Sequence, residues 1–231
     1  MAQRAGEKSL SQVIKERRAT NSFEPIPVHD EDLKKILQAG LEAPSGYNLQ
    51  PWRFVVVRDP EQKKKLRAAA MGQPKVEEAG AVIVACGDTQ GWRQDMHEMS
   101  KLALEHGYGT PEGLEQARQN IASFLGGTPG PAGGIAPDLG VWANRHATIA
   151  WTTMMWMAEA LGYDTAPMEG FFEDKVKDLL KIPASVRVVA LLAIGRRKGE
   201  DKPYGGRFPM ERTVFGEEWG KGIGSSGDRV I

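Results

Sequence analysis

Residues 43–54 read Ala-Pro-Ser-Gly-Tyr-Asn-Leu-Gln-Pro-Trp-Arg-Phe and run directly into the apolar segment Val55–Val57. Proline, glycine, serine and asparagine favour turns, and the amide and hydroxyl side chains among them can donate and accept hydrogen bonds. The β-branched residues that follow favour a strand. The stretch therefore predicts a ligand-binding loop that leads into a strand at the edge of a β-sheet.

The composition restricts the kind of partner. A chain of 231 residues fits one large domain better than two small ones, and we expect a single domain over residues 1–231. Its 30 basic residues are balanced by 30 acidic ones. A balanced chain has no global field that would attract nucleic acid or an anionic membrane. We therefore expect a small-molecule partner, and neither a nucleic acid nor a membrane.

The single cysteine, Cys86, ends the apolar run Ala81–Cys86, which has the pattern of a buried strand. One thiol cannot form an internal disulfide, and its place in a strand favours an inert core residue over a nucleophile. The segment Met1–Lys8 lacks the apolar region of a signal peptide, and no apolar stretch approaches the roughly 18 residues of a membrane span. These features predict a cytoplasmic protein.

Apolar periodicity predicts alternating helices and strands. Leu10 to Arg17 and Leu33 to Leu41 follow helical spacing, and residues 60–70 read as a charged surface helix. The expected strands span residues 53–58, 80–87 and 186–194. This alternation favours a mixed sheet covered by helices.

Residues 145–161 read Arg-His-Ala-Thr-Ile-Ala-Trp-Thr-Thr-Met-Met-Trp-Met-Ala-Glu-Ala-Leu, which is apolar on nearly every face of a helix. Such a helix cannot face water on all sides. It fits either the core of a large monomer or the interface between two subunits. Because helices of this kind also line subunit interfaces, we favour the interface over the core of a monomer.

Two segments are poorly suited to a packed core. The Gly- and Pro-rich residues 126–140 predict a loop, and residues 217–231 predict an extended tail that frays or lies on a partner. The tail contains Gly222–Gly227 in the form Gly-x-Gly-x-x-Gly, but no strand-to-helix turn surrounds it. We therefore reject a dinucleotide-binding fingerprint at this position.

The four histidines are scattered without the short spacings of a metal site. The one candidate cluster is His97 with Asp95 and Glu98, and a solvated helix face accounts for it. We expect no metal. The sequence also lacks a Gly-x-Ser-x-Gly elbow and a P-loop.

Arg17 and Arg18 end the first expected helix. They could be ordinary solvated cations at a helix C-terminus, or they could bind a phosphate through their planar forks. Their context is informative. The run 17–23, Arg-Arg-Ala-Thr-Asn-Ser-Phe, the loop at 44–52, the segment Pro-Met-Glu-Gly-Phe at 167–171 and Arg207 together resemble the FMN-dependent nitroreductase family. The resemblance covers about residues 9–215, with a poorly matching middle from 92 to 140.

The resemblance implies a set of residues that bind FMN, drawn from all four segments. They are Arg17, Arg18, Ala19, Asn21, Pro44, Ser45, Asn48, Gln50, Pro167, Met168, Glu169, Gly170 and Arg207. In the family the arginines grip the phosphate and the loop residues contact the flavin ring. The backbone of the Glu-Gly pair approaches the flavin N5, where hydride is exchanged.

This chain departs from the family at three positions. Ala19 replaces a serine that often helps to hold the phosphate, and Gly205 stands where many relatives carry a lysine. Asn21 replaces a cation at the pyrimidine edge of the flavin. An amide there donates hydrogen bonds without charge, so we expect an altered flavin potential.

The resemblance further implies an α+β fold with a central mixed β-sheet flanked by helices, and an intertwined homodimer with FMN at the subunit interface. NAD(P)H would deliver hydride through the flavin to a nitroaromatic, a quinone or an activated alkene in ping-pong turnover, and no catalytic side chain is required. Tyr47, Trp92 and Phe124 are candidate walls of the acceptor pocket, and ordinary packing accounts for each of them equally well. The alternatives are a flavin-binding store or redox sensor without turnover, or a relative that cleaves flavin or removes halogen.

Overall fold

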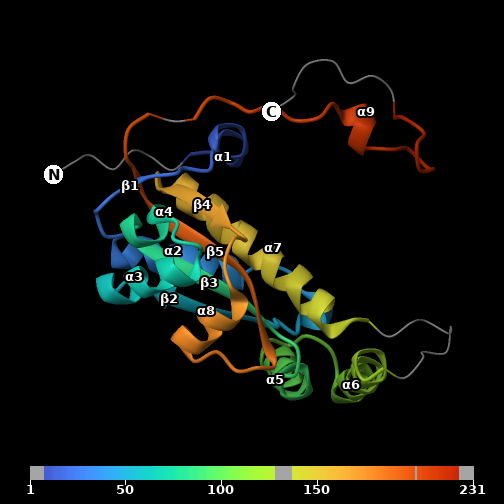
Figure 1. Ribbon diagram of the computed structural model, residues 1–231. Coiled ribbons are helices and arrows are strands. Elements are labelled where there is room, and N and C mark those ends of the chain that lie inside the picture. Colours follow the sequence, from blue (N-terminus) through green and yellow to red (C-terminus); the bar gives the residue numbers. More distant parts are fainter. Residues whose placement is uncertain (1–7, 128–136, 201, 224–231) are drawn as a thin grey trace.

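The computed structural model describes residues 8–127, 137–200 and 202–223. Its centre is a five-stranded sheet (Figure 1), in which β5 (Val186–Arg197) pairs with β1 (Phe23–Glu24), β3 (Ala81–Asp88) and β4 (Asp164–Met168). The edge strand β2 (Trp52–Val57) pairs with the other side of β3. The alternation of helices and strands thus gives the expected α+β fold, with β3 and β5 in the middle of the sheet.

The direction of the strands differs from the expectation. All four strand pairs are antiparallel, so the described sheet is not mixed. Among the described residues, parallel pairing is confined to an isolated bridge between Ala19 and Thr165. The alternation along the chain did not fix the direction, because two short helices, α3 (Pro60–Ala69) and α4 (Pro74–Glu78), connect β2 to β3 and return the chain beside β2 in the opposite sense.

Helices cover both faces of the sheet (Figure 1). Val82 and Val84 of β3 pack with α3, α4 and α8 (Glu173–Leu180) on one face. Ala81 and Ile83 point the other way and pack with α2 (Asp30–Leu41) and α7 (Leu139–Ala160). Because side chains alternate along a strand, this arrangement buries both faces of β3, as its uniformly apolar sequence predicts.

Helix α7 is longer than the apolar periodicity indicated. It begins at Leu139 because the Asp138 side chain accepts a hydrogen bond from the Val141 N–H at 2.9 Å and caps the first turn. The predicted loop at 126–140 therefore includes two helical residues at its end. Most of that loop, residues 128–136, lies outside the described residues.

A pair of helices, α5 (Trp92–Glu105) and α6 (Pro111–Leu125), stands at one end of the sheet beside the start of α7 (Figure 1). A separate apolar cluster holds them there. It includes Trp92 of α5, Ile121 of α6 and Trp142 of α7, each no more than 6% exposed. The start of α7 therefore joins this helix pair to the rest of the fold.

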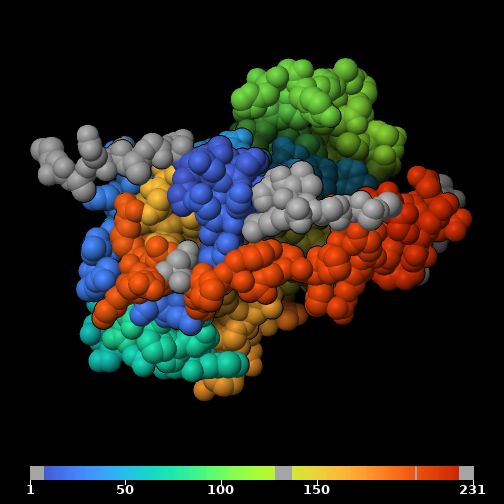
Figure 2. All heavy atoms as spheres, turned by 90° about the horizontal axis from the view of Figure 1, so that it is seen from above, coloured from blue at the N-terminus to red at the C-terminus, as the bar shows by residue number. Residues whose placement is uncertain are grey.

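At the other end of α7 lie the first helix, α1 (Leu10–Glu16), and a C-terminal arm, which we define as residues 202–223. The arm carries the short helix α9 (Met210–Thr213) and extends beyond the body of the protein (Figures 1 and 2). Its apolar side chains are exposed, with Trp219 at 92% and Phe208 at 63%. The predicted tail at 217–231 is described only as far as residue 223.

Cys86 lies in β3 and is buried in the core, as its sequence context predicts. Burial raises the pKa of its thiol to about 12. Across the described ranges, no helix is both long and apolar enough to cross a membrane. In the same ranges, no three histidine, cysteine or acidic side chains gather where they could hold a metal ion.

Candidate functional site

The loop at 45–50 connects α2 to β2 in a strained conformation. Tyr47, Asn48 and Gln50 have φ angles of 56°, 54° and 47°, in the left-handed region that residues with a side chain rarely adopt. The Ser45 hydroxyl oxygen accepts the Gln50 N–H at 2.9 Å and bridges the turn. Strained backbone of this kind persists where its surroundings hold it, and it gathers at ligand sites. The geometry supports the interpretation of this loop as a binding loop.

The polar groups of the loop remain available to a ligand. Asn48 is exposed, and its Oδ1 accepts from the Gln50 amide at 3.2 Å. Because the Ser45 oxygen is used as an acceptor, its hydroxyl hydrogen is free to donate. Pro44 is exposed at the start of the loop. The four loop residues named from the sequence therefore lie together.

Three arginines form a second group, which we call the arginine cluster: Arg17, Arg18 and Arg207. Arg17 follows α1 and is half-buried, and its Nη1 is buried without a hydrogen-bond partner. Burial lowers the pKa of Arg17, and the positive charges of Arg207 and Arg18 lower it further, against the opposing charge of Glu159. A buried guanidinium nitrogen without an acceptor, beside two further cations, fits a phosphate.

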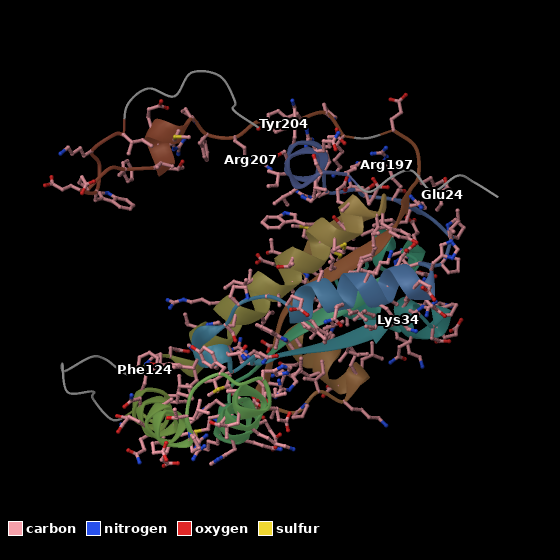
Figure 3. All side chains as sticks on the ribbon, turned by 180° about the vertical axis from the view of Figure 1, so that it is seen from behind. Glu24, Lys34, Phe124, Arg197, Tyr204 and Arg207 are labelled. Atoms are coloured by element: carbon pink, nitrogen blue, oxygen red, sulfur yellow. The ribbon has the colours of Figure 1, made fainter. Side chains whose placement is uncertain are left out.

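The arm brings Arg207 to this cluster. Tyr204 lies between the arginines, with the Arg18 guanidinium 4.8 Å and that of Arg207 5.8 Å from the centre of its ring. Figure 3 shows Tyr204 and Arg207 beside α1. Residues separated by about 190 positions in the sequence thus meet at one place. The predicted phosphate-binding arginines are all present there.

The segment after the cluster runs along β4. Ala19 forms the bridge to Thr165, and the Thr20 N–H donates to the Thr165 carbonyl at 3.0 Å. Asn21 follows this bridge and is exposed. The contact places the arginine cluster near β4, the strand that ends at Met168.

The end of β4 and the turn after it contain residues 167–170, in which the backbone of the Glu-Gly pair is predicted to approach the flavin N5. Pro167 and the buried Met168 end the strand, and Glu169 is exposed. The Gly170 carbonyl accepts a hydrogen bond from the Gln73 amide at 2.8 Å. A Cβ on Gly170 would lie 3.2 Å from the same nitrogen, so the absence of a side chain permits this close approach.

The sequence did not indicate two residues that support the site. Gln73 holds the Gly170 carbonyl, and His146 of α7 accepts the Gly46 N–H at 2.8 Å. Gln73 lies in a turn, and His146 is one of four histidines that have no informative spacing in the sequence. Each contact joins positions about 100 residues apart, which no local pattern reveals.

The three candidate walls of the acceptor pocket lie in different surroundings. Tyr47 and Phe124 are 47% and 40% exposed, and their rings meet edge to face at 6.3 Å. Phe124 lies on α6 (Figure 3). Trp92 is only 3% exposed and packs in the cluster between α5, α6 and α7. Tyr47 and Phe124 can therefore contact a ligand, whereas Trp92 packs in the core.

Two hollows adjoin the loop. One, of about 590 Å³, is bounded by Asn48 and Gln50, by apolar residues of α2, β2 and α5, and by the charged residues Arg53, Asp95 and Glu98. The other, of about 640 Å³, lies between α5 and α6 and is bounded by Tyr47 and Asn48. Asn48 borders both, so the loop is accessible on two sides.

The loop and the arginine cluster lie far apart within one chain. The loop contacts His146 near the start of α7. Arg17 lies near the end of α7, where the charge of Glu159 partly offsets the lowering of the pKa of Arg17 by burial. These two positions are 13 residues apart on one helix, or about 20 Å at 1.5 Å per residue. The structure therefore brings the predicted residues together in two separate groups.

Comparisons with known proteins agree with this geometry. A model of the nitroreductase family matches residues 14–196. The NADH dehydrogenase of Thermus thermophilus is 35% identical over 199 residues, which cover 86% of this chain and 91% of that protein. MhqN of Bacillus subtilis, provisionally named an NAD(P)H nitroreductase, is 32% identical over 209 residues and covers 89% and 97%.

A solved structure from Exiguobacterium sibiricum is similar in fold. It has a TM-score of 0.82 and 25% identity, over 92% of this chain and 99% of that one, and that protein was crystallised in complex with FMN.

Proposed function

Because the chain belongs to the nitroreductase family, we propose that it is an FMN-dependent oxidoreductase that uses NAD(P)H. Its acceptor is a nitroaromatic, a quinone or a similarly electron-poor compound, and turnover is ping-pong. The observation that carries this proposal is the arginine cluster, in which the buried Nη1 of Arg17 lacks a partner beside two further cations. A phosphate dianion can accept hydrogen bonds from these arginines. In the described contacts, the Arg18 and Arg207 side chains donate to backbone carbonyls and not to a carboxylate that would compete with the phosphate.

The chain's own residues bind and orient the cofactor. The arginine cluster holds the phosphate, and the loop offers Ser45 and Asn48 as uncharged donors and acceptors to the flavin ring. Gln73 fixes the backbone at Gly170, where a Cβ would lie 3.2 Å from the Gln73 amide nitrogen. When bound, the flavin would supply the redox chemistry between NAD(P)H and the acceptor. No side-chain acid or base is required.

We propose that the protein works as a homodimer with FMN at the subunit interface. The loop and the arginine cluster are about 20 Å apart along α7, and the ribityl chain between the flavin ring and the phosphate is much shorter. A second copy that brings its loop to the arginine cluster of the first completes the site. The exposed apolar residues of the arm, and Trp156 of α7 at 36% exposure, provide surface for such an interface.

A second candidate is a flavin-binding protein without turnover, such as a store or redox sensor. It is favoured by the reduced cationic character around the flavin, since Ala19, Asn21 and Gly205 add no charge. We also propose that the protein is cytoplasmic, which agrees with its single buried thiol.

A spectrum of the purified protein followed by anaerobic titration with NADH and NADPH tests the proposal. We expect the absorption of bound flavin, FMN released on denaturation, and bleaching by one or both nucleotides. Steady-state assays with a nitroaromatic, a quinone and an activated alkene then identify the acceptor class. Bound flavin that NAD(P)H does not reduce would favour the storage or sensor function, and a protein that binds no FMN would refute both.

A further inference from the structure

His146 makes the contact that begins the strained loop. Its Nε2 accepts the Gly46 N–H at 2.8 Å, while its Nδ1 lies 2.8 Å from the Trp142 carbonyl, one turn earlier on α7. Its ring packs against the indole of Trp142, with the ring centres 4.8 Å apart. Trp142 is only 6% exposed. The imidazole is therefore fixed by a buried neighbour on its own helix.

The two partners define the state of the imidazole. The Gly46 N–H can only donate, so Nε2 must carry a lone pair. The Trp142 carbonyl can only accept, so the hydrogen lies on Nδ1. In the neutral tautomer, both nitrogens therefore have hydrogen-bond partners. If His146 were replaced by glutamine, the uncharged side chain would offer an acceptor oxygen at a similar distance from the backbone.

The loop depends on this contact more than an ordinary turn would. Three residues just after Gly46 have left-handed φ angles, a conformation that needs support from neighbouring groups. Among the described contacts, two side chains from outside the loop support it: His146 accepts the Gly46 N–H at its start, and the Arg53 guanidinium donates to the Gln50 carbonyl at its end, at 3.1 Å. A Cβ on Gly46 would lie 3.2 Å from Nε2, so glycine allows the close approach.

We propose that His146 is a positioning residue of the flavin site. Its neutral imidazole holds the Gly46 N–H and so presents Ser45 and Asn48 in the conformation that receives the flavin ring. This inference rests on the proposed function, because the ligand of the loop is the flavin. His146 touches the loop and acts on the flavin through it.

The test compares His146→Leu, which removes the acceptor, with His146→Gln, which keeps one. His146→Leu leaves the part-buried Gly46 N–H unpaired, and we expect flavin affinity to fall about tenfold, whereas His146→Gln stays within about threefold of the wild type. FMN and riboflavin should weaken by the same factor, since the loop meets the ring and the phosphate is held elsewhere. At saturating FMN, the visible absorption band should shift in His146→Leu and recover in His146→Gln.

His97→Gln is the matched control, because His97 is an exposed residue of α5 away from the loop contacts. It should bind both flavins as the wild type does. If His146→Leu fails to fold, as judged by circular dichroism of the apoprotein, Gly46→Ala disturbs the same contact from the loop and should weaken both flavins similarly.

Two outcomes overturn the inference while leaving the proposed function intact. Wild-type affinity for both flavins in His146→Leu would show that the loop keeps its shape without the acceptor. Equal losses in the leucine and glutamine variants would assign the effect to ring packing against Trp142 instead of the hydrogen bond. A wild-type protein that binds no flavin would refute the proposed function itself.

Discussion

Replacing Arg207 by alanine tests the arginine cluster with little risk to the fold. Arg207 lies on the exposed arm, and its hydrogen bond within the described contacts goes to the neighbouring Gly206 carbonyl at 2.6 Å. Its charge nevertheless reaches Arg17, whose pKa is lowered chiefly by burial and then by Arg207. Removal should leave the apoprotein as stable as the wild type or slightly more stable, because a mutual repulsion is relieved.

The loss of affinity for FMN follows from the kind of contact that is removed. A hydrogen bond to a charged group contributes about 1.5 to 3 kcal/mol. Since 1.4 kcal/mol corresponds to a tenfold change, the dissociation constant for FMN should rise about 10- to 150-fold. Riboflavin lacks the phosphate, and its affinity should not change.

The assay is a fluorescence titration of the apoprotein with FMN and with riboflavin at fixed ionic strength. Arg212→Ala is the control, because Arg212 is an exposed cation on the same arm that packs over Phe208 at 3.7 Å. It should bind both flavins normally. An unchanged FMN affinity in Arg207→Ala, or an equal loss for FMN and riboflavin, would remove Arg207 from the phosphate site.

Three further changes probe the interface, the ring edge and the fold. Trp156→Asp places a charge on an apolar face of α7 and should abolish both the dimer and FMN binding; light scattering that finds a dimer with full flavin content would contradict this. Asn21→Lys should stabilise the anionic reduced flavin, and ~1.4 kcal/mol of stabilisation relative to the oxidised flavin would raise the two-electron potential by ~30 mV. An anaerobic redox titration measures this change, and a potential that stays the same or falls would show that residue 21 does not face the ring. Burial alone would raise the pKa of Glu173, but hydrogen bonds from Arg187 and the Val188 N–H outweigh it and lower the pKa. The ionised carboxylate therefore stabilises the fold above the pKa of a free glutamate. This stabilisation is lost as the pH falls through the pKa of Glu173 in the folded protein. Glu173→Gln should therefore cost about 1 to 2 kcal/mol near neutral pH, and thermal melts should show the difference shrinking in acid; a constant difference would contradict it.

Local sequence patterns predicted the parts of the fold that depend on periodicity. The helices that begin near Leu10 and Leu33, and the strand through Cys86, appear where apolar spacing placed them. Strand β4 was not predicted, because it has only five residues and contains Pro167, which reads as a break. The start of α7 was misplaced because glycine and proline nearby hid the Asp138 cap.

The candidate site also contains residues that the sequence predicts and residues that it does not. The loop and the arginines could be named from the sequence because each is a compact motif that resembles a known family. The supporting contacts of Gln73 and His146 could not, because a single hydrogen bond across about 100 residues leaves no local signal. Trp92 was a candidate for the pocket because aromatic residues favour ligand walls and cores alike, and only packing distinguishes the two.

The burial of Cys86 protects its thiol from the hydrogen peroxide that a flavin enzyme can produce. Reduced flavin that meets oxygen yields hydrogen peroxide, and peroxide attacks cysteine as the thiolate. The chain has one cysteine, and a pKa of about 12 keeps it protonated inside the sheet. Oxidative damage during turnover in air should therefore fall on exposed methionines such as Met71, where sulfoxide formation is a lesion that cells can reverse.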